Sequence, residues 1–238
     1  RAAYSSGTPA LGVGPGNVPA FIEKTADIKM AVSRIIAGKI FDNGVICASE
    51  QAVVVEREIY KEVKKEFINQ GCYFVNEEEK LKMEKIIDTP YGSLNAKIVG
   101  KTASQLADMA KIEVPENTKI IIAEETGVGK GYPFSREKLS PILAFYVEDD
   151  WKKGCDKCIE LLDYGGMGHT LGIHSNDKDI IMEFALRKPA SRIIVNSPTT
   201  HGAIGATTNL APALTLGCGA VGGSATSDNV SPMNLINI

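Results

Sequence analysis

Residues 141–175 read PILAFYVEDDWKKGCDKCIELLDYGGMGHTLGIHS, and this stretch decides the fold class. PILAFYVE is an apolar run typical of a buried strand, and DDWKKGCDKCIELLDYGG is typical of a helix that stops at glycine. HTLGIHS then reads as a second strand. A strand, a helix and a strand in succession predict two parallel strands joined by a crossover helix.

The same alternation extends over most of the chain. Further helices are expected over residues 57–71, 77–88, 103–112 and 177–188. Further strands are expected over residues 52–55, 96–100, 118–125 and 191–197. Another helix should begin near Ala26 with Thr25 as its cap. Residues 1–20 read as a loop with at most a short strand, and the chain from His201 onward shows little periodicity. The predicted fold class is therefore α/β, a mostly parallel sheet with helices on both faces.

The composition excludes several functional classes. The chain has 238 residues, of which 44% are hydrophobic and 23% charged, as in ordinary globular proteins. A net charge of −3 predicts no nucleic-acid partner and no membrane-surface partner. No apolar run approaches the roughly 18 residues that a membrane span requires, and the first residues do not resemble a signal peptide. Five cysteines at irregular spacing indicate reduced thiols and a cytoplasmic location.

Cys47 lies in the segment FDNGVICASEQ, residues 41–51, between an apolar helical stripe and a short β-branched run. A loop between two buried elements can hold a side chain rigidly while exposing it to a cleft. A cysteine is a good nucleophile only as thiolate, so catalysis requires backbone amides or nearby positive charge to lower its pKa. Local context alone favours the alternative, a buried structural cysteine that follows a helix.

FDNGVICASEQ resembles the active-site segment of the aldehyde dehydrogenase superfamily, specifically of its CoA-acylating branch. Three further segments agree in order and spacing: KLSPILAFY (138–146), GGMGHT (165–170) and LAPALTLGCG (210–219). The resemblance covers essentially the whole chain. It implies the fold of an aldehyde dehydrogenase catalytic domain, NAD or NADP as cofactor and coenzyme A as co-substrate. The implied reaction is oxidation of a short-chain aldehyde to acyl-CoA, and the reverse.

The resemblance also implies roles for three residues. Cys47 would attack the aldehyde and carry the acyl group as a thioester, while its backbone N–H helps to hold the oxyanion. Glu137 matches the glutamate that contacts the nicotinamide ribose, a task that suits a carboxylate; the alternative is a surface glutamate in a charge cluster. His169 would lie near the pocket and help to deprotonate the CoA thiol; the alternative is a structural or solvated histidine.

One absence favours CoA transfer over hydrolysis. The glycine-rich segment LGVGPG, residues 11–16, lacks the third glycine of the dinucleotide fingerprint, since Asn17 stands there. In hydrolytic aldehyde dehydrogenases the matching segment carries a water-activating glutamate, and Val13 stands at about that position here. Without this base, we expect the thioester to persist until a thiol acceptor reacts with it.

Cys155 and Cys158 form a CxxC pair. A structural zinc site requires four ligands, and the sequence holds no second pair. Both cysteines fall within a predicted helix, so we expect them to pack and predict no metal site. Cys72 and Cys218 are likewise not predicted to be catalytic.

Family members have a separate nucleotide-binding domain that is mostly encoded before the catalytic segment. This chain begins 46 residues before Cys47, so we expect a fragment that lacks this domain, binds NAD weakly and is inactive alone. Residues 1–204 would form the catalytic cysteine domain. Residues 205–238 would return toward the cofactor and oligomerisation region. The expected partners are a small aldehyde and CoA, with assembly as a homo-oligomer.

Two other functions stay open at this point. A glutamyl-phosphate reductase also uses a motif cysteine and lacks the hydrolytic glutamate, but its chemistry uses phosphate instead of CoA. A non-catalytic α/β interaction module would carry an inert Cys47. The sequence does not determine the aldehyde, the choice between NAD and NADP, the oligomeric state, the role of His201 or whether an alcohol dehydrogenase domain follows.

Overall fold

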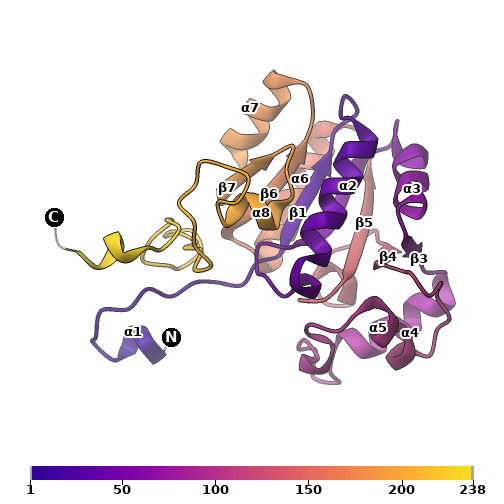
Figure 1. Ribbon diagram of the computed structural model, residues 1–238, viewed down its shortest axis with the longest axis horizontal. Coiled ribbons are helices and arrows are strands. Elements are labelled where there is room, and N and C mark those ends of the chain that lie inside the picture. Colours follow the sequence, from indigo (N-terminus) through magenta and orange to yellow (C-terminus); the bar gives the residue numbers. More distant parts are fainter. Residues whose placement is uncertain (1, 237–238) are drawn as a thin grey trace.

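The computed structural model describes residues 2–236, and its centre is a seven-stranded sheet in which every neighbouring pair of strands is parallel (Figure 1). In the order in which they lie side by side, the strands are β3 (Cys72–Phe74), β4 (Ile120–Glu124), β5 (Ile142–Glu148), β2 (Glu50–Glu56), β1 (Val18–Ile22), β6 (Gly168–His174) and β7 (Ala190–Val195). Parallel neighbours require crossover connections, and most of these are helices. The predicted α/β fold is confirmed.

Helices cover both faces of the sheet (Figure 1). One face carries α2 (Ile28–Ile40), α3 (Tyr60–Asn69) and α8 (Thr199–Ala203). The other carries α4 (Glu77–Ile87), α5 (Ala103–Ala110), α6 (Trp151–Gly165) and α7 (Lys178–Arg187). In α2 the buried apolar stripe includes Val32, Ile35 and Ile36, which pack in one cluster with Val53 of β2. Among residues 2–236, no helix is both long and apolar enough to cross a membrane.

Three expectations about local structure are wrong. Residues 1–20, expected as a loop with at most a short strand, contain the short helix α1 (Ala2–Ser5). Residues 96–100, predicted as a strand, begin instead with the 3-10 helix η2 (Ala96–Ile98). The side chain of Asn95 accepts a hydrogen bond from a backbone N–H two residues ahead, and such a bond favours a turn. The cap of α2 is Asp27, whose carboxylate accepts from a backbone N–H in the first turn. Thr25 does not cap the helix, because its hydroxyl bonds outside it.

Two strands carry weak sequence signals. β1 is fully buried at the centre of the sheet, but it is short, contains Pro19 and follows the glycine-rich segment. Its register with β2 shifts at Val18/Pro19, which accommodates a residue without an N–H. β3 has three residues and directly follows Gly71, so the pattern shows only the end of α3 there. Cys72 is buried in this strand, which agrees with its predicted packing role.

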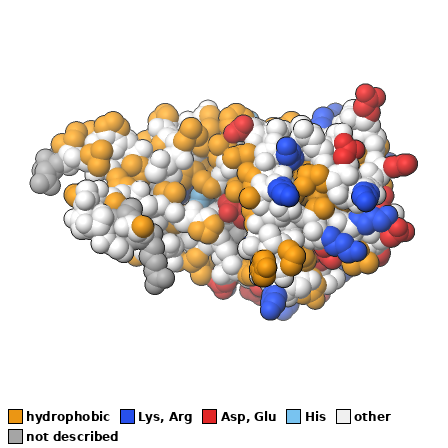
Figure 2. All heavy atoms as spheres, turned by 90° about the horizontal axis from the view of Figure 1, so that it is seen from below, with side chains coloured by type: hydrophobic (Ala, Val, Ile, Leu, Met, Phe, Trp, Pro, Cys, Tyr) orange, Lys and Arg blue, Asp and Glu red, His pale blue; other side chains and the backbone are white. Residues whose placement is uncertain are grey.

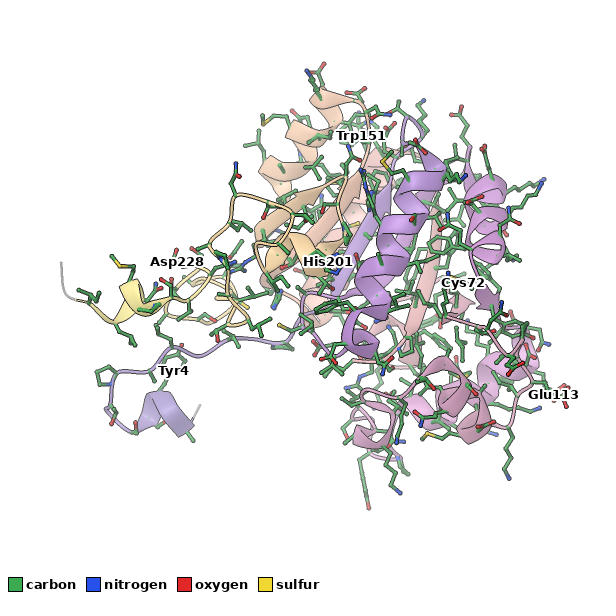
Figure 3. The ribbon with its side chains drawn as sticks, in the orientation of Figure 1. Tyr4, Cys72, Glu113, Trp151, His201 and Asp228 are labelled. Atoms are coloured by element: carbon green, nitrogen blue, oxygen red, sulfur yellow. The ribbon has the colours of Figure 1, made fainter. Side chains whose placement is uncertain are left out.

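The two ends of the described chain lie together, to one side of the sheet (Figures 1 and 3). The Tyr4 hydroxyl, in α1 (Ala2–Ser5), accepts hydrogen bonds from the Gly12 N–H at 2.7 Å and the Ala225 N–H at 3.3 Å. The tail ends in the short helix η4 (Pro232–Leu235). Apolar side chains gather at this end of the molecule, whereas charged side chains gather at the other (Figure 2). The exposed apolar residues here include Val13, Leu214, Val221, Met233 and Leu235.

Candidate active site

Four neighbouring strands bring the predicted site residues to one edge of the sheet. These strands lie in the order β5, β2, β1, β6. Glu137 comes shortly before β5, Cys47 shortly before β2 and Gly16 shortly before β1, while His169 is the second residue of β6. Because parallel strands point the same way, their amino ends share one edge, and the three predicted site residues converge there.

The loop that carries Cys47 has an uncommon backbone shape. After α2 the chain passes through η1 (Phe41–Gly44), where Asp42 and Asn43 have φ of 49° and 50° and Gly44 has φ of 74°. Asp, Asn and Gly are the residues that best tolerate this left-handed region, which explains the DNG turn. A Cβ on Gly44 would lie 3.0 Å from the Ser140 backbone, so the loop packs tightly against the segment that leads into β5.

Cys47 is the one cysteine of the described chain that is not buried. It packs beside a small apolar cluster that includes Ala48 of its own loop. Burial raises the pKa of the Cys47 thiol to about 11, and the charges of Glu137 and Cys218 add to the rise. Arg192 lowers this pKa, but by less than burial raises it. The sequence reasoning requires backbone amides or nearby positive charge to lower the pKa of a catalytic Cys47. Both act here, through a backbone hydrogen bond and through Arg192, but burial outweighs them, so the net pKa is raised and the thiol is neutral near pH 7.

Gly16 lies in contact with all three predicted site residues. Its N–H donates to Oε1 of Glu137 at 3.0 Å. A Cβ at this position would lie 1.8 Å from the carbonyl oxygen of Cys47 and 3.4 Å from Cδ2 of His169. No side chain fits in that space, so glycine here allows the three predicted residues to meet.

Glu137 is half-buried and borders a cavity of about 250 Å³. The other residues that line the cavity are Pro15, Leu94, Arg136, Tyr164 and Gly165. Burial raises the pKa of Glu137, while the bond from Gly16 and the charge of Lys39 lower it. A carboxylate at the wall of a cavity can accept hydrogen bonds from a ligand's hydroxyls, and the ribose contact that the resemblance implies for Glu137 stays a prediction.

His169 is fully buried beside Cys47. Its Nδ1 lies 2.9 Å from Oγ1 of Thr170, and its Nε2 has no hydrogen-bond partner within residues 2–236. Burial lowers the pKa of His169 to about 4, and the charge of Arg192 lowers it further. The imidazole is therefore neutral at pH 7 and can accept a proton.

The other two histidines occupy different places. His174 is the last residue of β6, at the opposite edge of the sheet, and burial lowers its pKa to about 4. His201 lies on α8 next to α2 (Figure 3). Its ring packs edge-on against Phe41, with ring centroids 5.1 Å apart, so His201 contacts the loop that leads to Cys47.

Arg192 and Cys218 join the site although no motif pointed to a role for either. Arg192 is buried in β7. Its guanidinium donates to the carbonyls of Gly217, Ser227 and Asp228 and to Oδ1 of Asn229. These bonds hold the tail against β7, and a Cβ on Gly14 would lie 3.4 Å from Sγ of Cys218. The charges of both residues act on the pKa of Cys47, so the tail forms part of the surroundings of the nucleophile.

Cys155 and Cys158 are buried on the inner side of α6, where the sequence places them. The Lys188 ammonium contacts Sγ of Cys155, and burial raises the pKa of Cys158. In the part of the chain that the structure describes, no group of three or more His, Cys, Asp or Glu side chains could hold a metal ion.

Comparison with protein families agrees with this arrangement. The model of the aldehyde dehydrogenase family matches residues 3–135, and the chain belongs to this family. Over its whole length the chain is 47% identical to an aldehyde-alcohol dehydrogenase of Clostridium acetobutylicum, of which it covers 28%.

Solved structures give the same result. An acetylating aldehyde dehydrogenase from Geobacillus thermoglucosidasius superposes with a TM-score of 0.97 at 55% identity, over 99% of this chain and 52% of that one. A propionaldehyde dehydrogenase from Rhodopseudomonas palustris, solved with bound CoA and an acylated cysteine, superposes with a TM-score of 0.85 at 26% identity, over 97% of this chain and 50% of that one. The chain thus spans about half the length of these structures.

Proposed function

We propose that the chain supplies the acyl-carrying nucleophile of a CoA-acylating aldehyde dehydrogenase. The enzyme would oxidise a short-chain aldehyde to acyl-CoA with NAD or NADP, and catalyse the reverse reduction. The observation that carries the proposal is the meeting of Cys47, Glu137 and His169 around Gly16. A non-catalytic module has no need for an accessible thiol beside a neutral, unpartnered imidazole nitrogen.

Cys47 acts first. Its thiol first loses its proton to solvent, and the small thiolate fraction attacks the aldehyde carbon. The Cys47 backbone N–H would donate to the resulting alkoxide. A nicotinamide cofactor, when bound, would supply the hydride acceptor that converts this thiohemiacetal to a thioester on Sγ. Glu137 would hold the cofactor by accepting hydrogen bonds from its ribose hydroxyls.

His169 acts in the second half of the reaction. Its Nε2 is unprotonated near pH 7 and has no hydrogen-bond partner within residues 2–236, so it would be the group in place to accept the proton of the CoA thiol. The CoA thiolate then attacks the thioester carbon and expels the Cys47 thiolate. Hydrolysis competes poorly, since Val13 stands where hydrolytic relatives carry a glutamate. The carboxylate of Glu137 raises the pKa of Cys47, but it is already bonded to the Gly16 N–H.

The organisation of the whole protein belongs to the same proposal. We assign residues 1–204 to the catalytic cysteine domain and residues 205–238 to a segment that returns toward the cofactor and oligomerisation region. The bonds from Arg192 to the tail and the apolar side chains at the joined ends of the chain support a further partner surface there. Five free thiols support a cytoplasmic location, and a homo-oligomer is the expected assembly.

The test uses the native full-length protein. Wild type should reduce NAD or NADP with acetaldehyde only when CoA is present, and should oxidise the reduced cofactor with acetyl-CoA. Cys47→Ser should abolish both reactions, and mass spectrometry of wild type quenched without CoA should find the acyl group on the Cys47 peptide. His169→Gln should slow transfer to CoA and leave acylation of Cys47 intact. Turnover with acetyl phosphate in place of acetyl-CoA would instead support the glutamyl-phosphate reductase alternative.

A further inference from the structure

Three segments of the site form a closed ring of contacts. The backbone of Gly16 lies against the carbonyl of Cys47, and the Gly16 N–H donates to Glu137. The ring is completed between Lys138, which follows Glu137, and Gln51, which lies four residues after Cys47. A closed ring constrains the spacing of Cys47 and Glu137 from two sides.

Gln51 completes the ring through its bond to Lys138, and every polar atom of its side chain forms a hydrogen bond. Its Oε1 accepts from the Lys138 backbone N–H at 3.0 Å and from the Lys39 ammonium at 3.3 Å, and its Nε2 donates to the Ser49 carbonyl at 3.3 Å. Both partners of Oε1 are donors, so the amide cannot be flipped. Its backbone carbonyl accepts from Nζ of Lys138 at 3.0 Å. Gln51 is 1% exposed, so water does not replace these bonds.

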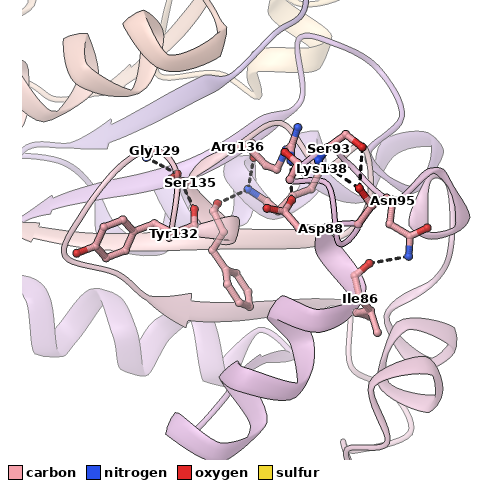
Figure 4. A network of polar contacts seen from close by, with 12 residues as sticks. Ile86, Asp88, Ser93, Asn95, Gly129, Tyr132, Ser135, Arg136 and Lys138 are labelled. Atoms are coloured by element: carbon pink, nitrogen blue, oxygen red, sulfur yellow. Dashed lines mark hydrogen bonds and ion pairs between the residues drawn. The ribbon is translucent and has the colours of Figure 1, made fainter.

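Further bonds, which do not involve Gln51, also hold the segment that carries Glu137 (Figure 4). Arg136 forms an ion pair with Asp88 at 2.6 Å. Nζ of Lys138 donates to the carbonyl of Phe134, in η3 (Pro133–Ser135), at 2.6 Å. The segment is therefore a rigid unit, and the bonds to Gln51 set where this unit lies relative to the strand that follows Cys47.

We propose that Gln51 is a positioning residue that sets the distance between the nucleophile Cys47 and the cofactor-binding carboxylate of Glu137. This inference rests on the proposed function. In the proposed reaction a hydride would pass from a carbon attached to Cys47 to a cofactor whose ribose Glu137 would hold, so an error in this spacing would lengthen the path of the hydride. Gln51 touches neither substrate nor cofactor.

The experiment compares Gln51→Met with Gln51→Glu in the native full-length protein. Methionine keeps the side-chain length but removes both the acceptor and the donor, whereas glutamate keeps the acceptor and loses only the donor to the Ser49 carbonyl. For Gln51→Met we expect the KM for NAD to rise about tenfold, as for the loss of one buried hydrogen bond. The primary isotope effect with deuterated aldehyde should increase, and the KM for CoA should stay unchanged. Gln51→Glu should restore the KM for NAD.

A second measurement does not depend on turnover. The charges of Glu137, Cys218 and Arg192 act on the Cys47 thiol, and His169 lies beside the Gly16 backbone that contacts the Cys47 carbonyl. Glu137→Gln removes a charge that raises the pKa of Cys47, so the pH profile of its alkylation should move to lower pH. Gln51→Met should move the profile in the same direction, because it lets Glu137 withdraw.

The outcomes are distinct. A folded Gln51→Met protein with the wild-type KM for NAD, isotope effect and alkylation profile overturns the positioning role. A wild-type protein that does not couple aldehyde oxidation to CoA overturns the proposed function, while the alkylation profiles still decide the role of Gln51. If Gln51→Met does not fold, Gln51→Asn, which withdraws the amide by one methylene, carries the same expectations.

Discussion

The thiol of Cys47 should titrate far above neutral pH in this chain. Burial raises its pKa to about 11 from an ordinary value of 9.0, and the nearby carboxylate of Glu137 adds to the rise. His169 cannot contribute a step near neutral pH, because its pKa lies at about 4 and it stays uncharged from pH 6 upward. The thiolate population at Cys47 is therefore set by one deprotonation.

The size of the effect follows from that shift. Each pH unit below the pKa lowers the thiolate fraction tenfold, so at pH 7 about one Cys47 in ten thousand is thiolate. An ordinary thiol with a pKa two units lower has about a hundredfold more thiolate at the same pH. Since the thiolate is the species that reacts, the alkylation rate of Cys47 should rise about tenfold per pH unit between pH 7 and 10.

The assay is alkylation by iodoacetamide, followed by mass spectrometry of the peptide that contains each cysteine. Cys47 should still react ahead of the other four, because it alone among the described cysteines is not buried. Cys72 serves as the internal control, since it is buried and burial raises its pKa to about 12. A rate for Cys47 that levels off below pH 9 would refute this account of its surroundings, and a step between pH 6 and 8 would show that His169 is charged there.

Three substitutions test the packing around the site. Gly16→Ala places a Cβ 1.8 Å from the Cys47 carbonyl, so it should destabilise the protein by about 3 kcal/mol in urea unfolding and abolish acylation of Cys47; wild-type stability would contradict the close approach. Arg192→Met removes four hydrogen bonds to the tail. Limited proteolysis should then cleave the chain after residue 204 much faster than in wild type. An unchanged digest would show that other contacts hold the tail. Gly154→Ala places a Cβ 2.4 Å from the Phe21 ring and should lower stability by about 1–3 kcal/mol without changing the alkylation profile of Cys47. A changed profile would contradict the distance of Gly154, near the start of α6, from the site.

The periodic parts of the chain could be predicted because local pattern and burial agree there. Strands β4 and β5 are covered on both faces, so they read as continuous apolar runs. Helix α6 shows its buried stripe every three or four residues. β1 was the harder case, since its strand character comes from neighbours on both sides and not from its own five residues.

The site could be predicted only in part, for a similar reason. Cys47, Glu137 and His169 lie in sequence motifs that are specific enough to identify a family. Gln51 and Arg192 act through bonds to residues 87 and 25 to 37 positions away, which no local spacing reveals. The sequence does not predict the raised pKa of Cys47. The rise comes from burial and from the charge of Glu137, and both depend on how distant segments pack.

The edge of the sheet at which the site lies has a chemical consequence. In open α/β sheets, ligands usually bind at the carboxyl ends of the strands, where the following helices begin and their N-termini can hold phosphate. Here the site lies at the amino ends, so the N-termini of α2, α3, α6 and α7 face away from Cys47. The amino edge instead allows segments of backbone to approach closely, at Gly14, Gly16 and Gly168. Gly16 and Gly168 have no room for a side chain, and Gly14 lies against one. A dinucleotide whose ribose reaches Glu137 must therefore have its phosphates held by groups other than these helix N-termini, and substitutions at the helix N-termini should leave the KM for NAD unchanged while substitutions at Gly16 should not.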